Sequence, residues 1–500
     1  MSLSSALPTR LPRFPRPTRP TWLRSPRVLR TEVLAGLVVA LALIPEAISF
    51  SLVAGVDPRV GLFASFTMAV TIALVGGRPA MISAATGAVA LVVAPLVRER
   101  GLDYLIATVL LAGLLQVLLG VLGVARLMRF IPRSVMVGFV NALAILIFTA
   151  QVPNLVGVPW LVYPLAVAGV AMIVLLPRLT TVVPAPLIAI AVLTAITVGV
   201  RLAVPTVGDK GALPDTLPTL GIPNVPYTWD TLRVIAPYAL GMALVGLMES
   251  LMTARLVDDV TDTHSSKRRE SWGQGVANIV TGFFGGMGGC AMIGQTMINV
   301  RSGARTRLST FLAGSFLLVL VVVLGPVVAI IPMAALVAVM VMVSVGTFDW
   351  HSIRLSTLRR LPRSETAVMV ITVAVVVATS NLAIGVVVGV LVASVLFARR
   401  VAHVVSVTSV LDPDGSDRVY FVHGQVFFAS TEDLLTRFDY AGDPDRVVVD
   451  MSDAHVWDAS SVAALDAVTT RYARRGKQVQ ITGLNEGSGR LHDRLAGQLS

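Results

Sequence analysis

Charged residues are scarce in this chain of 500 residues. Asp, Glu, Lys and Arg together make up 14% of it, whereas a soluble globular protein carries roughly 25%. Hydrophobic residues make up 55%. Apolar runs of about 20 residues, long enough to span a bilayer, recur between Thr31 and Ala398. The composition excludes an ordinary soluble protein and predicts a polytopic α-helical membrane protein.

Cysteine is nearly absent as well. The single residue Cys290 excludes an internal disulfide and any Cys-based metal cluster. The sequence shows no metal-ligand spacing, no Gly-Lys phosphate loop and no Ser/His/Asp arrangement. It therefore predicts no metal, no cofactor and no catalytic residues, and the protein is not expected to be an enzyme.

A cleavable signal peptide is missing too. Residues 1–30 hold seven Arg, six Pro and no acidic residue, and no apolar core precedes a small-residue cleavage site. This segment is expected to be a disordered, basic, cytoplasmic tail that contacts anionic lipid headgroups or only sets the topology. The net charge of +11 gives no reason to expect a nucleic-acid partner, because the Arg residues lie in short loops beside the spans.

The distribution of charge sets the orientation. Positive residues gather in short loops, at Arg126, Arg129 and Arg133, at Lys267 to Arg269, at Arg301 to Arg307, at Arg354 to Arg363, and at Arg399 and Arg400. The loop from Pro205 to Asp230 instead holds three Asp and one Lys. Because positive loops stay in the cytoplasm, we expect about fourteen spans, with both chain ends on the cytoplasmic side of the inner membrane.

The composition changes after Arg400. "DRVYFVHGQVFFAS" alternates like a pair of strands with a turn at Gly424, and "RVVVDMS" and "QVQITGL" are typical of short strands. "SSVAALDAVTTRYARRGK" has helical spacing and a basic end. Strands that alternate with helices predict a small cytoplasmic α/β domain over residues 401–500.

The apolar part of the chain repeats itself. "LALIPEAIS" at Leu41 resembles "LVGLMESLM" at Leu244, and "IPRSVMVGFV" at Ile131 resembles "IPMAALVAVM" at Ile331. We expect two repeats, residues 31–204 and 230–400. The orientation sends their first spans in opposite directions, so the repeats are inverted. Inverted repeats are typical of transporters whose site lies near the bilayer midplane.

Two glycine-containing segments occupy equivalent places in these repeats. "GGRPAMISAATGAVALV" follows residue 75 and "GGMGGCAMIGQTMINV" follows residue 284. Each is interpreted as extended chain that enters the membrane and leads into a half-helix, beginning near Thr86 and near Cys290 respectively. The two helix N-termini would face each other and bind an anion through free N–H groups, without a cationic side chain. The alternative is close helix packing through small residues.

Few ionisable residues fall within the expected spans. Glu46 and Glu249 are repeat partners, and a carboxylate at membrane depth indicates function by default. We interpret them as proton-coupling groups; the alternative is a structural hydrogen bond. Thr253, one turn after Glu249, would allow the pair to hold Na⁺ instead. Phe50 is interpreted either as part of the wall of the site or as a packing residue. Gln116 is interpreted as a packing residue.

These segments together resemble the SulP family of sulfate-permease-type anion transporters. "LIPEAISFSLVAGVDPRVGLFASF" is similar to the first-span pattern of the family, and "ESLMTARLVDD" and "ANIVTGFFGGMGGCAMIGQTMINVRSGARTRLS" to its eighth to tenth spans. "VVVDMSDAHVWDASSVAALD" resembles a STAS domain. The resemblance, over roughly residues 30–500, implies two inverted seven-span repeats in a uracil-permease-like fold. It also implies a core domain that moves against a gate domain, and a homodimer.

The resemblance also implies site residues. The family places the anion between the starts of spans three and ten, which match Thr86 and Gly87 on one side and Gly289, Cys290 and Ala291 on the other; the thiol itself is given no chemistry. Sodium-coupled bicarbonate members have an Asp and a Thr in span eight that match Glu249 and Thr253. Glu in place of Asp favours protons. No Lys or Arg lies between Val276 and Val300, which argues against chloride-channel-like behaviour.

In the STAS-like segment, Ser460 matches the serine that is phosphorylated in anti-sigma-factor antagonists, and we expect it to cap a helix N-terminus instead. The main hypothesis is a secondary transporter of small anions, of the dicarboxylate, sulfate or bicarbonate class, that works by proton symport and alternating access. Three alternatives stay open: a sodium-coupled bicarbonate or anion symporter, a nucleobase–proton symporter, and a membrane-tethered STAS signalling protein.

Overall fold

The computed structural model describes residues 25–123, 131–178, 184–214, 216–402 and 405–498, with residues 401 and 402 described by their backbone alone. Most of the predicted basic tail, as well as Arg126 and Arg129, therefore lies outside the described residues. The chain divides by its internal contacts into two units, residues 1–388 and 389–500. The two units are taken separately below.

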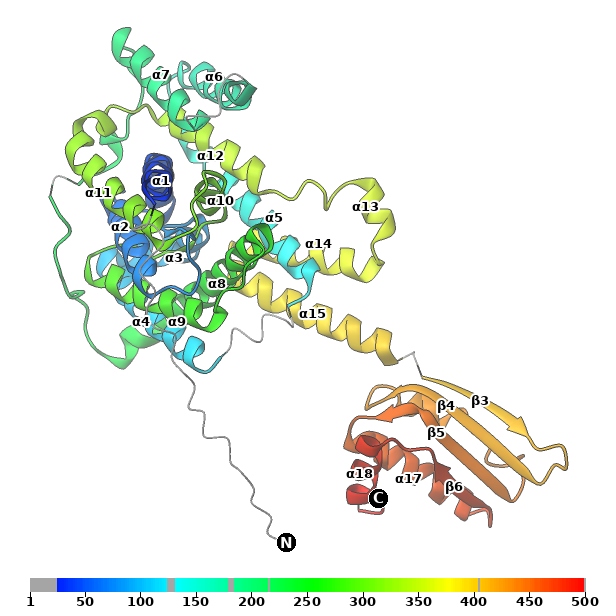
Figure 1. Cartoon of the computed structure of the whole chain (residues 1–500). Coiled ribbons are helices and arrows are strands. Elements are labelled where there is room, and N and C mark those ends of the chain that lie inside the picture. The colour runs from blue at the N-terminus through cyan, green and yellow to red at the C-terminus, as the bar shows by residue number, and fades with distance from the viewer. Residues whose placement is uncertain (1–24, 124–130, 179–183, 215, 403–404, 499–500) are drawn as a thin grey trace. The chain divides into compact units, whose positions relative to one another are not determined.

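Helices make up the first unit (Figure 1). The first half of this unit contains α1 (Pro26–Ala54), α2 (Pro58–Val75), α3 (Gly87–Arg100), α4 (Leu102–Val121), α5 (Arg133–Thr149), α6 (Val162–Leu175) and α7 (Ala185–Gly199). The second half contains α8 (Trp229–Thr261), α9 (Lys267–Phe283), α10 (Ile293–Arg301), α11 (Arg307–Ala329), α12 (Met333–Thr347), the short α13 (Leu355–Arg360), α14 (Arg363–Thr379) and α15 (Leu382–Ala402), which continues into the second unit. Short 3-10 helices lie at Val152–Leu155, Leu176–Arg178 and Gly208–Lys210.

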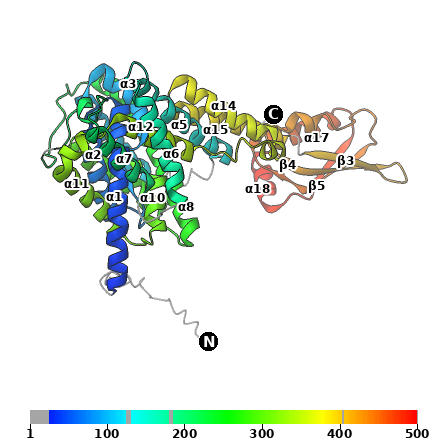
Figure 2. The ribbon, with the colours of Figure 1, turned by 90° about the horizontal axis from the view of Figure 1, so that it is seen from above.

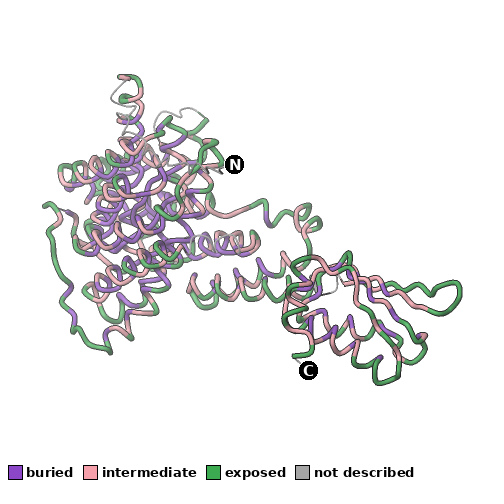
Figure 3. The backbone as a smooth tube through the Cα atoms, turned by 60° about the horizontal axis from the view of Figure 1, so that its bottom comes forward, coloured by how far each residue is buried: buried purple, intermediate pink, exposed green. Residues whose placement is uncertain are grey.

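Length and composition identify the helices that suit a bilayer. Among the described residues, seven helices are long and apolar enough to cross a membrane on their own, and three shorter apolar helices accompany them. Buried residues gather at the centre of the helical unit (Figure 3), whereas large apolar side chains such as Leu118, Val167 and Val323 are exposed on its outside. This outward apolar surface is suited to lipid.

The helices pack in a way that reveals the repeat. Helix α1 packs against α2, α3, α10 and α11, and α8 packs against α9, α10, α3 and α4. Exchanging α1–α4 with α8–α11 turns one set of neighbours into the other. Pairing α5 with α12 and α6 with α14 likewise turns the contact of α6 with α12 into that of α14 with α5. This arrangement is that of two related halves, as the sequence predicts. Figure 2 shows the N-terminal end of α1 projecting beyond the surrounding helices.

A small sheet joins the halves at the two glycine-containing segments. Strand β1 (Ser83–Ala84) pairs antiparallel with β2 (Cys290–Ala291), and Ala84 lies opposite Cys290. A Cβ atom added at Gly289 would lie 2.0 Å from the carbonyl oxygen of Ala84. Glycine is required there because the two backbones approach too closely for any side chain.

The second unit contains a mixed sheet with helices. Its elements are β3 (Ser406–Leu411), β4 (Asp417–Val426), α16 (Thr431–Leu435), β5 (Arg446–Val456), α17 (Ala459–Ala473), β6 (Gln478–Thr482) and α18 (Glu486–Leu495). The strand order is β3-β4-β5-β6, with β3 antiparallel to β4 and the other neighbours parallel. This unit has its own apolar core, which includes Tyr420, Val449, Leu465 and Tyr472.

Two local predictions in this unit are wrong. Gly424 is not a turn between two strands, because β4 runs through it and pairs there with Ala454 of β5. Ser460 is not the N-cap of α17. That position belongs to Asp458, whose Oδ1 accepts a hydrogen bond of 2.9 Å from the Ser461 N–H. Ser460 is exposed in the first turn of α17.

Candidate functional site

A cavity of about 460 Å³ lies between the starts of α3 and α10. The other walls come from α1, α5, α8 and α12. Its lining residues are Glu46, Phe50, Thr86, Gly87, Ala88, Phe139, Val140, Leu143, Ile147, Glu249, Met252, Met292, Ile293, Gly294, Val343, Gly346 and Thr347. Residues from both repeats therefore meet around one space, which suits a site between inverted halves.

The first residues of both half-helices line this cavity. Gly87 and Ala88 form the first turn of α3, and Ile293 and Gly294 form that of α10. The first N–H groups of a helix have no carbonyl partner within it, and in the described part of the chain these four donate to no other protein acceptor. Two helix N-termini with about half a positive charge each and free donors are suited to an anion.

The predicted half-helix starts agree with the structure on one side. Thr86 is the N-cap of α3, and its Oγ1 accepts a hydrogen bond of 3.4 Å from the Val89 N–H. Thr86, Gly87 and Phe50 line the cavity. Phe50 also limits the space at Gly87, because a Cβ atom there would lie 2.8 Å from its ring.

The predicted start of the second half-helix, near Cys290, is wrong by three residues. Helix α10 begins at Ile293, whereas Cys290 and Ala291 belong to strand β2. Gly289, Cys290 and Ala291 do not line the cavity, and Met292, Ile293 and Gly294 do. The sheet with β1 accounts for the shift, because it keeps the chain extended for two residues beyond Gly289. The anion-binding role of the three residues stays a prediction.

Glu249 is linked to the N-cap of α3 through Cys290. The Cys290 thiol donates to Glu249 Oε2 at 3.0 Å, and its Sγ lies 3.1 Å from Thr86 Oγ1 in a second hydrogen bond. Cys290 is fully buried and Glu249 is 9% exposed. A continuous line of polar atoms therefore joins a carboxyl group of α8 to the start of α3.

Glu46 has a different partner. It lines the same cavity from α1, and its carboxyl group is hydrogen-bonded by the side chain of Gln295 of α10. Helix α1 continues through Pro45, and the Ser49 hydroxyl donates to the Pro45 carbonyl at 2.8 Å. The two repeat-related acids thus face one cavity with different neighbours, and among the described lining residues they alone are ionisable.

Thr253 is placed away from the cavity. Its hydroxyl donates to the backbone carbonyl of Glu249 at 2.8 Å, and the side chain is fully buried. It is absent from the cavity lining. The structure therefore does not bring the Thr253 hydroxyl and the Glu249 carboxylate into one common space.

Two buried amides, to which the sequence analysis gave no such role, hold the glycine-rich segment in place. Asn278 of α9 accepts from the Gly289 N–H at 2.9 Å and donates to the Gly289 carbonyl at 3.0 Å. It also donates to Gln116 Oε1 at 2.8 Å. Gln116 is therefore more than packing, because it orients the amide that clamps Gly289. An amide in the middle of an apolar run was the only signal for this role.

A buried carboxylate holds the first glycine-containing segment in a similar way. Glu270 Oε2 accepts from the N–H groups of Gly77 and Arg78 at 2.7 and 3.0 Å. Gln274 donates to Glu270 Oε1 at 2.8 Å and to Ser83 Oγ at 2.7 Å. Two backbone donors of the extended chain that leads into β1 are thus satisfied by α9, and the Ile82 N–H donates to Thr296 Oγ1 of α10 at 3.0 Å. Irregular backbone inside a membrane requires such partners.

The sequence did not identify α5 and α12 as walls of the cavity, although the repeat matches at their starts are visible in it. Phe139 and Leu143 of α5 and Val343, Gly346 and Thr347 of α12 line the cavity. The two matching segments at Ile131 and Ile331 begin these helices. The similarity between these two segments was the signal that could have identified α5 and α12 as parts of the site.

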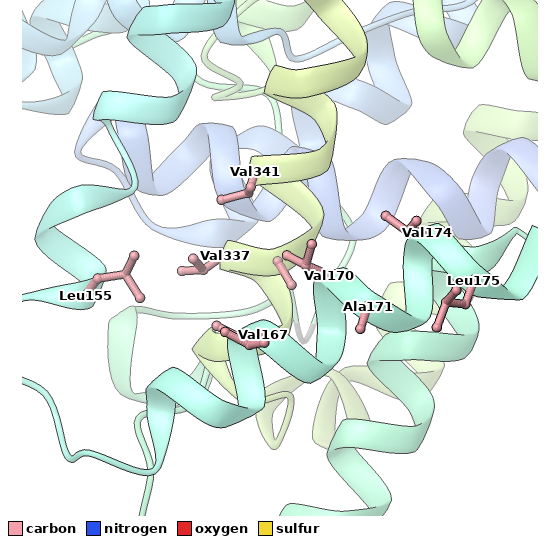
Figure 4. Close-up of a pocket in the computed structure, with 10 residues that line it drawn as sticks. Leu155, Val167, Val170, Ala171, Val174, Leu175, Val337 and Val341 are labelled. Carbon is pink, nitrogen blue, oxygen red and sulfur yellow. The ribbon is translucent and has the colours of Figure 1, made fainter.

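A second cavity, of about 470 Å³, is unsuited to an anion. It lies between α6 and α12 and contains no polar side chain (Figure 4). Its lining consists of Leu155, Ala166, Val167, Val170, Ala171, Val174, Leu175, Val337, Ala338 and Val341. An anion there would lose its hydration without gaining a hydrogen-bond donor.

Sequence comparison places most of the chain in known families. The model of the Sulfate permease family matches residues 29–166 and 160–372, and that of the STAS domain matches residues 410–495. A Bacillus subtilis protein, "Putative sulfate transporter YbaR", is 53% identical over 94% of this chain and 97% of its own length.

Solved structures resemble the fold. The transmembrane domain of a cyanobacterial bicarbonate transporter, BicA, has a TM-score of 0.63 at 26% identity and covers 72% of this chain and 98% of its own. The murine anion transporter Slc26a9, in the inward-facing state, has a TM-score of 0.80 at 17% identity, over 95% of this chain and 89% of its own. The latter likeness shows the fold alone. The chain belongs to the sulfate permease family, as a multi-pass membrane protein with a C-terminal STAS domain.

Proposed function

We propose that the protein is a proton-coupled secondary transporter of small anions, which binds its substrate between the N-termini of α3 and α10. The observation that carries this proposal is the set of four N–H groups, of Gly87, Ala88, Ile293 and Gly294, around one cavity. They supply directional donors and the positive ends of two helix dipoles. No cationic side chain is needed, so the anion is held without a fixed full charge that would slow its release.

The choice of protons over sodium follows from the surroundings of Glu249. A buried carboxyl group beside a thiol is suited to gaining and losing a proton, whereas a sodium site needs several oxygen ligands around one point. Thr253, the second oxygen ligand that the sodium alternative needs, directs its hydroxyl to a backbone carbonyl. Glu46 supplies a second carboxyl group on the other side of the repeat axis.

The substrate class follows from the family and the site. Relatives are named as transporters of sulfate or bicarbonate, and the cavity volume of about 460 Å³ also admits a small dicarboxylate. Sulfate is the first candidate because the relative with 53% identity carries that name. The nucleobase alternative and the signalling alternative have no such support among these relatives.

The proposal includes the surroundings of the protein. We expect an inner-membrane homodimer with both chain ends and the STAS domain in the cytoplasm. Arg-rich loops precede α5 and α14, and an Asp-containing loop precedes α8. The order of the spans puts the two Arg-rich loops on one side of the membrane and the Asp-containing loop on the other. This supports the orientation, because positive loops stay in the cytoplasm.

The test is uptake by the purified protein in proteoliposomes. Labelled sulfate, bicarbonate and succinate are offered with and without an acidic exterior, and empty liposomes are the control. We expect accumulation of at least one anion, driven by the pH gradient. Uptake that follows a sodium gradient at constant pH would support the sodium alternative, and uptake of uracil the nucleobase alternative. Failure to accumulate any of these anions contradicts the proposal.

A further inference from the structure

The buried thiol of Cys290 lies between a group that can carry a proton and a group that faces the cavity. Its neighbours are Glu249 Oε2 at 3.0 Å and Thr86 Oγ1 at 3.1 Å. Glu249 and Thr86 both line the cavity, whereas Cys290 does not. A thiol has one weak donor and one weak acceptor. It can therefore donate to only one of these two neighbours at a time, while it accepts from the other.

We propose that Cys290 is a positioning residue that passes the protonation state of Glu249 to the Thr86 hydroxyl, so that protonation frees this hydroxyl to bind the anion. The inference rests on the proposed function and explains how proton and anion binding are coupled at its site. It also replaces the expectation that the thiol has no chemistry.

The direction of the hydrogen bonds reverses when Glu249 gains a proton. With Glu249 ionised, the S–H of Cys290 donates to the carboxylate, and the Thr86 O–H donates to Sγ. The Thr86 hydrogen is then turned away from the cavity. With Glu249 protonated, its O–H donates to Sγ, and the S–H donates to Thr86 Oγ1. The Thr86 hydrogen is then free to turn to an anion. Each proton stays on its own heavy atom, and the added proton stays on Glu249.

The Thr86 hydroxyl is well placed for this function. It is the N-cap of α3, directly before the Gly87 and Ala88 N–H groups, and its side chain is 2% exposed. A hydroxyl that donates to an anion adds a charge-assisted hydrogen bond to those of the backbone. Anion binding and proton binding then favour each other, which is the linkage that symport needs.

Few other titratable groups face Glu249. Cys290 comes from β2, and Glu46 lines the same cavity. The charged side chains of the helices that pack on α8 lie near the helix ends, away from the lining: Arg98, Glu99 and Arg100 of α3, Asp103 of α4, Lys267, Arg268, Arg269 and Glu270 of α9, and Arg301 of α10. The Glu46→Gln variant, measured in the same way, should therefore keep the pH effect, because the titrating group is Glu249.

The experiment measures the affinity of the purified full-length protein for sulfate at pH 6 and pH 8. Sulfate is a suitable probe because it stays a dianion over this range. We expect the wild-type protein to bind more tightly at pH 6. In Cys290→Ala the ratio of the sulfate affinities at pH 6 and pH 8 should be about tenfold smaller than in the wild-type protein, because a hydrogen bond to a charged group contributes that much to binding. Cys290→Ser, which can donate and accept, should retain it.

A second pair of variants tests the same line of atoms without changing Cys290. Thr86→Val removes the hydroxyl at nearly the same shape and should lose the same part of the pH effect, whereas Thr86→Ser should retain it. This pair decides the matter if Cys290→Ala fails to fold. A full wild-type pH effect in Cys290→Ala or Thr86→Val overturns the inference. A wild-type protein without sulfate binding, or without a pH effect on it, contradicts the proposed function instead, and the inference falls with it.

Discussion

At the scale of single residues, Glu249 and Glu46 are related by the repeat but have different surroundings. Glu249 is hydrogen-bonded to Cys290 and through it to the start of α3, whereas Glu46 is hydrogen-bonded by Gln295 of α10. Only Glu249 therefore has a thiol between itself and the N-cap threonine. The two acids should differ in their effect on coupling.

We expect Glu249→Gln to lower proton-driven anion uptake at least about tenfold, because an amide of the same shape cannot exchange the proton. Glu46→Gln should reduce uptake less. The measurement is sulfate uptake by proteoliposomes with an acidic exterior, with the amount of folded protein checked by size-exclusion chromatography. Normal pH-driven uptake by the folded Glu249→Gln protein would remove Glu249 from the coupling step.

At the scale of elements, the contact of β1 with β2 depends on one glycine. A methyl group at Gly289 would lie 2.0 Å from the Ala84 carbonyl oxygen, whereas nothing lies within 4 Å of one at Gly294. Gly289→Ala should destabilise the fold by roughly 1–3 kcal/mol, as overpacking does. Gly294→Ala is the matched control and should change little. Thermal unfolding in detergent checks both, and equal melting temperatures would show that β1 and β2 do not need this close approach.

The same element decides what a bulky residue at Gly289 or Ala291 would do. Neither position lines the cavity, and Ala291 packs in a buried cluster with Met81 and Ala254. Such substitutions would disturb packing rather than occupy the site.

The start of α3 was predictable from the sequence, and the start of α10 was not. Thr86 is a good N-cap residue after a run of small residues, so the local signal was sufficient. Cys290 and Ala291 are extended because they pair with Ala84 and Ser83, far away in the chain, and local sequence does not show that pairing. In α17, Asp458 and Ser460 are both suited to capping. Asp458 also accepts from the Phe428 N–H at 2.7 Å, a contact that decides the choice and that only the tertiary structure reveals.

The STAS unit contains a buried carboxylate with two tyrosines. Asp443 accepts hydrogen bonds from Tyr472 and from Tyr420, the latter at 2.8 Å, and forms an ion pair of 2.9 Å with Arg418. Burial first, and then the hydrogen bond to Asp443, raises the pKa of Tyr472 above its usual value. Burial likewise raises the pKa of Tyr420. Both phenols are therefore neutral in the folded domain over the ordinary pH range.

This arrangement makes the STAS unit sensitive to high pH. A raised pKa in the folded state stabilises the fold below the unfolded tyrosine pKa of about 10, and this contribution is lost as the pH rises above it. Unfolding of the unit should therefore become easier above about pH 10. Tyr472→Phe should cost about 1 kcal/mol at neutral pH and weaken the pH effect. Near-ultraviolet circular dichroism between pH 8 and 12 measures it; an unchanged pH profile in Tyr472→Phe would contradict this account.

At the scale of the whole molecule, the two units have separate cores. Truncation after Arg400 should leave the spans able to insert, because their hydropathy is unchanged. Transport should weaken, or the protein should assemble incorrectly. Sulfate uptake and the oligomeric state of the truncated protein check this together. If both match the full-length protein, the STAS domain is dispensable for transport and assembly.

The family and the inverted repeat were accessible from sequence because motifs and repeat matches extend over most of the chain. The cavity was accessible only in part, because its walls come from α1, α3, α5, α8, α10 and α12, which meet through packing rather than through sequence order. Glu46, Glu249 and Thr86 were identified from their residue types and repeat positions, Phe50 from its spacing after Glu46, and Gly87 from the family resemblance. Met292, Ile293 and Gly294, like the α5 and α12 walls, became visible once the helices were placed.

The central claim is that the anion binds between the starts of α3 and α10, and Gly294 offers the most direct test. It lines the cavity, and nothing lies within 4 Å of a Cβ atom added there. Gly199, at the end of α7, is equally open but does not line the cavity. The measurement is sulfate binding and pH-driven sulfate uptake by the wild-type, Gly294→Leu and Gly199→Leu proteins in one membrane preparation. The account predicts that Gly294→Leu folds but loses both activities, while Gly199→Leu keeps them. Normal binding and uptake by Gly294→Leu would place the anion elsewhere and contradict the account.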